Sequence, residues 1–82
     1  MNKKWVLFHL KEAQEELNRT IIDIENQEDY DFGEFVVAMG HLYHHLNTAW
    51  NSQKATEEQV KLNSEEDFFS WRQFPKDIYL GP

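Results

Sequence analysis

The chain has 82 residues, of which 15 are Asp or Glu and 8 are Lys or Arg, so its net charge is −7. The excess of acid is concentrated in residues 21–50, where six acidic side chains occur and Lys and Arg are absent. Such a field repels phosphate groups, so nucleic acid and anionic membrane surfaces are disfavoured as partners. Cations or a basic protein surface would be attracted.

Length and composition also limit the kind of core. A chain of this size buries only about 60–65% of its unfolded surface, yet 40% of the residues are hydrophobic and 15% are aromatic. We therefore expect part of the apolar surface to meet a second chain, as in a homodimer. The absence of cysteine excludes disulfides and thiolate metal ligands. No stretch approaches the roughly 20 apolar residues that a membrane span needs, and a cytoplasmic location is expected.

Two long amphipathic helices are predicted, over about residues 3–26 and about residues 32–52. Asp31 is suited to cap the second helix, because its carboxylate can accept from the backbone N–H of Gly33 or of Glu34. Rods of about 36 and 30 Å joined by a short turn should fold back as an antiparallel hairpin. The apolar residues expected in its seam are Val6, Leu10, Ala13, Leu17, Ile21 and Ile24, then Phe32, Phe35, Met39, Leu42, Leu46, Ala49 and Trp50.

Two short helices and an extended tail are predicted for the rest of the chain. Thr56 with Gln59, and Ser64 with Asp67, have the spacing of capping boxes, and they open helices over about residues 56–62 and 64–73. Pro75 ends the last helix and leaves an aromatic tail over residues 74–82. The aromatic segment that is expected to lie across the hairpin consists of Phe68, Phe69, Trp71, Phe74 and Ile78 to Leu80, and the alternative is that it docks on a neighbouring chain. The candidate interaction surface consists of Trp50, Phe68, Phe69, Trp71 and Phe74.

The acidic turn between the long helices has a spacing that resembles an EF-hand calcium loop. Counted from Asp23, acidic or amide side chains occupy the liganding positions as far as Glu34. However, Glu28 stands where the loop requires a glycine for its sharp turn. A turn that simply ends the first helix is therefore the favoured interpretation.

Histidines supply the sharpest functional hypothesis. His41 and His45 are four residues apart on the second predicted helix, so both rings leave the same side, and Glu34 lies seven residues before His41. These three side chains could hold Zn²⁺ or Fe²⁺ if the first helix added a ligand, with His9 or Glu12 as the choices. The favoured interpretation is that these histidines are ordinary boundary and surface residues, since they fall away from the centre of the apolar face.

The sequence predicts one all-α domain over residues 1–82, namely a helical hairpin with a short C-terminal helix and an extended aromatic tail, which assembles as a dimeric bundle. A glycine-rich phosphate loop, a nucleophile elbow and a His-Glu-x-x-His motif are all absent, so an enzyme is not indicated. The favoured function is a protein–protein interaction or regulatory accessory module that acts as a homodimer and needs no cofactor. The alternative is a metal-binding protein or a metal-dependent enzyme.

Overall fold

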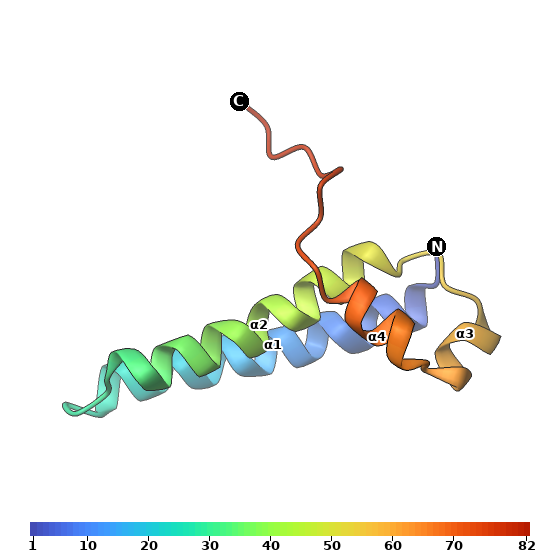
Figure 1. Ribbon diagram of the computed structural model, residues 1–82. Coiled ribbons are helices and arrows are strands. Elements are labelled where there is room, and N and C mark those ends of the chain that lie inside the picture. The colour runs from blue at the N-terminus through green and yellow to red at the C-terminus, as the bar shows by residue number, and fades with distance from the viewer.

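The computed structural model describes residues 1–82 as four helices with no β-strand. They are α1 (Lys3–Asn26), α2 (Phe32–Asn51), α3 (Glu57–Leu62) and α4 (Glu65–Trp71). α1 and α2 lie side by side as an antiparallel hairpin, and the two short helices gather at its open end (Figure 1). The predicted all-α hairpin is confirmed.

Local signals in the sequence set the ends of these helices. The Asp31 carboxylate accepts from the backbone N–H of Glu34 at 2.9 Å, and the capping box of Thr56 and Gln59 is complete. Ser64 caps α4 by accepting from the backbone N–H of Asp67 at 3.1 Å. Each of these side chains satisfies a backbone donor that the first turn of a helix leaves free. The predicted caps are confirmed, and the helix bounds lie within two residues of those expected.

The turn between the long helices is short. Asp23 belongs to α1 and Glu34 belongs to α2, so only residues 27–31 connect the helices. A twelve-residue calcium loop would need the whole span from Asp23 to Glu34 as a loop. The interpretation as a helix-ending turn is therefore correct.

The open end of the hairpin is closed by the start of the chain. The backbone N–H of Asn2 donates to the carbonyl of Gln53 at 2.6 Å, and its side-chain amide donates to the carbonyl of Ala55 at 3.0 Å. Three residues on, the Trp5 indole N–H donates to the hydroxyl of the buried Ser52 at 2.8 Å. These bonds hold the start of α1 against the connection that follows α2.

Two asparagines of α2 hold α4. The side-chain amide of Asn47 donates to the carbonyl of Arg72 at 3.0 Å, and that of Asn51 donates to the carbonyls of Trp71 and Gln73 at 2.8 and 2.6 Å. Carbonyls at the end of a helix have no partner within that helix, so these amides complete its hydrogen bonding. They fix where α4 ends and where the chain leaves it.

The expected seam of the hairpin is confirmed at Ala13 and Ala49, which are buried, and is wrong for the larger apolar residues of α1. α1 buries His9, Ala13 and Thr20. In contrast, four larger apolar residues of α1 that we placed in the seam are 43–50% exposed. Only eight residues of the chain are buried, and none is a large apolar side chain. α1 and α2 thus meet along small and polar residues beside the apolar stripe. The exposed residues are Leu10, Leu17, Ile21 and Ile24.

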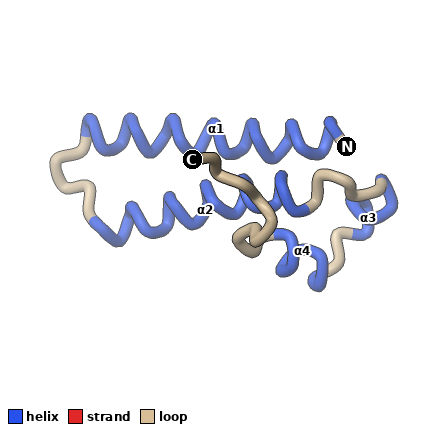
Figure 2. Tube along the Cα trace, turned by 90° about the horizontal axis from the view of Figure 1, so that it is seen from above, coloured by secondary structure: helices blue, strands red, loops and turns tan.

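The expectation that the aromatic segment lies across the hairpin is confirmed for Phe68, Trp71 and Phe74 and is wrong for its last residues. α4 packs on α2, but residues 78–82 stand away from the helices (Figures 1 and 2). Tyr79 and Leu80 are 84% and 89% exposed. The chain leaves α4 in a direction that the two asparagines of α2 determine, and this direction does not return to the hairpin.

Candidate functional site

One face of the hairpin carries the apolar stripes of both long helices. On α1, Leu10 and Ile21 each follow a buried residue, His9 and Thr20 respectively, by one position. One position turns a side chain by about 100° around the helix, so the stripe is displaced to one side of the seam. On α2, Leu46 and Trp50 likewise follow His45 and Ala49 by one position.

The two displacements bring both stripes to the same side. Each stripe is rotated from its seam in the same sense when viewed from the N-terminus of its own helix. Because α1 and α2 are antiparallel, equal senses of rotation point to one common face of the pair. We call this surface the apolar face, and its members are Leu10, Leu17, Ile21, Ile24, Phe32, Phe35, Met39, Leu46 and Trp50.

A cluster of histidines lies on the other side of the hairpin. The Nδ1 atoms of His9 and His45 are 3.0 Å apart, and the ring of His44 lies with its centroid 4.8 Å from that of His45. Phe68 of α4 covers the cluster, at 5.4 Å from His44. These residues, with Trp5 and others, line a cavity of about 340 Å³.

Burial disfavours a charge on two rings of the cluster, those of His9 and His44. Burial, together with the neighbouring His45 and His44, lowers the pKa of His9 to about 4. Burial also lowers the pKa of His44, with smaller effects from His45 and Arg72. A Nδ1···Nδ1 contact requires one ring to donate and the other to accept, which two neutral imidazoles can do. The remaining nitrogens, Nε2 of His9 and Nδ1 of His44, are buried without a protein partner.

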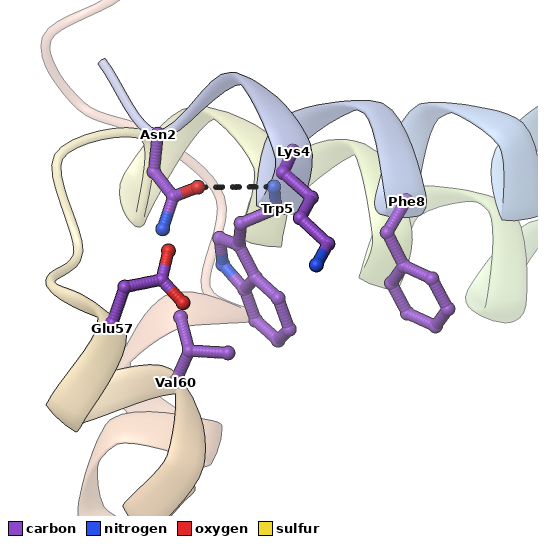
Figure 3. Close-up of a pocket in the computed structure, with 6 residues that line it drawn as sticks. All are labelled: Asn2, Lys4, Trp5, Phe8, Glu57 and Val60. Carbon is purple, nitrogen blue, oxygen red and sulfur yellow. Dashed lines mark hydrogen bonds between the residues drawn. The ribbon is translucent and has the colours of Figure 1, made fainter.

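A smaller cavity of about 250 Å³ adjoins this cluster. Trp5 and Phe8 extend from α1 toward it, and Val60 of α3 lies beside the indole (Figure 3). Trp5, Phe8 and Val60 line both cavities. Lys4 and Glu57 complete the wall of the smaller one, which suits a small apolar group but presents no acid–base pair in contact.

The predicted metal ligands are divided between two places. His41 and Glu34 line an open cleft of about 470 Å³ near the turn, where Nδ1 of His41 lies 3.8 Å from a carboxylate oxygen of Glu16. His45 turns instead to His9, so the first helix does supply an imidazole, but to only one of the three predicted residues. Groups of three or more His, Asp or Glu side chains arranged to hold a metal ion are absent.

The aromatic residues predicted as an interaction surface also fall into two groups. Phe68 and Trp71 pack inward, Phe68 on His44 and Trp71 on Trp5, whose ring centroid is 6.2 Å away. Phe69 remains 55% exposed. The other two, Trp50 and Phe74, lie where the tail leaves the hairpin: Trp50 donates its indole N–H to Asp77 at 2.9 Å, and Phe74 lies 5.2 Å from Tyr43.

Sequence reasoning missed the structural role of His9 and of the asparagines that hold α4. His9, Ala13 and Thr20 are spaced by four and seven residues and are small or polar, which is the signal of a close helix contact. That signal was weaker than the stripe of larger apolar residues beside it. For Asn47 and Asn51, nothing local in the sequence distinguishes a side chain that caps a distant helix from one in water.

Comparisons with protein-family models, with curated proteins and with solved structures gave no match. None of the four helices is both long enough and apolar enough to cross a membrane.

Proposed function

We propose that this chain is a protein–protein interaction module that acts as a homodimer, with the apolar face as its interface. One observation carries the proposal: the hairpin aligns two apolar stripes on a single face, and no element of the chain covers their length. Monomeric proteins rarely expose a contiguous apolar surface larger than a few hundred Å². Burial of one large apolar side chain contributes about 1.5–3 kcal/mol, so covering the face would be strongly favourable.

A second copy is the partner that fits this face most directly. In a twofold dimer the same patch meets itself, so the patch must be self-complementary. The apolar face meets this condition, because its two stripes lie side by side on α1 and α2 and none of their residues is charged. Two hairpins apposed in this way would form a four-helix bundle.

A regulatory role would use the acidic turn. The six acidic residues of residues 21–50 lie toward the closed end of the hairpin, where no Lys or Arg of that segment offsets them. A dimer built on the apolar face would leave this end exposed as an acidic rim that attracts a basic protein surface. The cytoplasmic location stays a prediction.

The test compares two neighbouring isoleucines of α1. Ile21 belongs to the apolar face, and Ile22, one position further, is 57% exposed on the outer side of the helix. We expect Ile21→Glu to weaken the dimer by more than about 100-fold, because it would bury an unpaired carboxylate. Ile22→Glu adds the same charge outside the interface and should leave the dimer constant within about threefold.

Sedimentation equilibrium of the wild type and both variants measures these constants. The wild type should sediment at twice the 9.9 kDa mass of the chain. A wild type that stays monomeric at every concentration would contradict the proposal. Equal weakening by both variants would place the interface elsewhere.

Metal binding is a second candidate, because the structure brings imidazoles from two helices together at 3.0 Å. Neutral imidazole is the form that binds a metal, and burial favours it for His9. If the cluster binds Zn²⁺, native mass spectrometry should show one retained ion per chain, lost in His45→Gln and kept in His41→Gln. Loss with His41→Gln but not with His45→Gln would favour the cleft near the turn, and no retained Zn²⁺ in the wild type would exclude both. A metal-dependent enzyme has no further support.

A further inference from the structure

The last nine residues form an arm that is tied to the hairpin only at its base. We call residues 74–82 the C-terminal arm. Its base is held where the Trp50 indole donates to Asp77 at 2.9 Å and where Phe74 packs on Tyr43, with ring centroids 5.2 Å apart. Beyond the base, no backbone hydrogen bond involves residues 78–82.

The exposed part of the arm is the part that is least suited to water. Ile78, Tyr79 and Leu80 are consecutive, and Tyr79 and Leu80 are 84% and 89% exposed. A segment that remains exposed in solution is usually polar and charged, because it gains nothing from apolar side chains. Three apolar residues at this position therefore indicate a surface that the arm covers in the functional state.

The arm leaves the hairpin beside the apolar face. Trp50, which anchors the arm, is a member of that face. Tyr43, the other contact of the base, lies seven residues before Trp50 and therefore on the same side of α2. The arm departs on the side of the hairpin away from α3 (Figure 1), and Figure 2 shows it crossing α2 in projection toward α1. A chain seated on the apolar face would thus lie alongside the arm.

The area of the apolar face indicates what the arm adds. Two helices about 30 Å long and about 10 Å wide present about 600 Å² to a flat partner. A stable interface usually buries about 800 Å² of accessible surface on each partner, so contacts from the arm would add to those of the face. The five residues beyond the anchored base reach about 17 Å when extended, which is enough to place Tyr79 and Leu80 against the nearer helix of a partner about 10 Å across.

We propose that the C-terminal arm of each chain closes over the second copy seated on the apolar face, so that Tyr79 and Leu80 pack on the partner's helices. This inference rests on the proposed homodimer and states how the dimer is held. The exchange is reciprocal under twofold symmetry, so each hairpin both extends an arm and receives one. The anchors Trp50 and Phe74 remain within their own chain and fix the point at which the arm crosses.

The test combines a variant pair with a direct observation of the arm. Tyr79→Ser with Leu80→Ser should weaken the dimer about tenfold to a hundredfold in sedimentation equilibrium, because two large apolar side chains leave the interface. Lys76→Ser changes an exposed residue at the base of the same arm and should leave the constant within about threefold. Isotope-filtered NOE spectra of a mixture of ¹³C-labelled and unlabelled wild-type chains should show contacts from Leu80 to the other chain.

The outcomes separate this inference from the function on which it rests. Contacts across chains together with the weakened double variant support the arm. A dimer of unchanged strength in the double variant, or contacts of Leu80 only to its own hairpin, would overturn the arm and leave the homodimer standing. A wild type that shows no dimer in the same sedimentation measurement would overturn both.

Discussion

His9 occupies a place in the hairpin that an apolar residue would ordinarily fill. It is 6% exposed, and the rings of Trp5 and His45 lie against it at centroid distances of 4.4 and 5.3 Å. A buried polar group is tolerated when it is hydrogen-bonded and uncharged, and the Nδ1 contact with His45 provides the bond. The same environment makes a charge on this ring unfavourable, since burial and the neighbouring His45 and His44 lower the pKa of His9.

This arrangement predicts a loss of stability in mild acid. The unfolded chain binds a proton on His9 near pH 6.5, whereas the folded chain does so only near pH 4. Between these values the unfolded state carries more protons, so the free energy of unfolding falls as the pH falls, and below pH 4 the contribution of His9 is constant. From pH 7 to pH 5 we expect His9 to account for about 1–2 kcal/mol, reduced where water reaches the cavity.

Urea unfolding of the wild type and of His9→Gln, at pH 7 and pH 5 with a chelator present, measures this effect. The carboxylates titrate in both proteins, so the difference between the two pH dependences isolates His9. Asn18→Gln, which changes an exposed side chain of α1 that does not titrate, serves as a control and should leave the pH dependence unchanged. If His9→Gln kept the full acid sensitivity of the wild type, the lowered pKa of His9 would not be its cause.

At the scale of the helix, the features that could be predicted from the sequence depend on local signals. Asp31, Thr56 and Ser64 act within three residues of their own positions, so their hydrogen bonds could be predicted from spacing alone. The three- and four-residue periodicity likewise predicted the long helices and their hairpin. These features depend on neighbours along the chain and not on the tertiary structure.

The facing of the two long helices could not be predicted in the same way. A wide apolar stripe on each helix shows that its residues avoid water, but not whether they meet α1, α2 or another chain. The structure places the small residues Ala13 and Ala49 in the seam, where they permit close approach, and leaves Leu17 and Leu46 beside it. The contact of His9 with His45 depends on which sides of α1 and α2 meet. It therefore could not be chosen from the sequence over other pairs of residues on the two helices.

At the scale of the whole molecule, charge indicates how two copies would be oriented. The closed end of the hairpin holds the six acidic residues of residues 21–50, while acidic and basic residues balance at the open end. Parallel copies would place two acidic turns side by side, well within reach of mutual repulsion. Antiparallel copies separate them by the length of the hairpin, several times the Debye length of about 8 Å at physiological salt. We therefore expect the copies to be antiparallel.

Spin labels can test this orientation, because the chain has no cysteine of its own. In an antiparallel dimer, labels on Glu28→Cys at the two turns should lie about 35 Å apart or more, the length of α1. In a parallel dimer the same labels would lie within about 20 Å, the width of two packed helices. Glu15→Cys, near the middle of α1 and exposed, should give a similar distance in either orientation and so shows that the dimer is present. Pulsed electron paramagnetic resonance measures both distances, and a short distance at residue 28 would mean that apolar contact outweighs the repulsion between the turns.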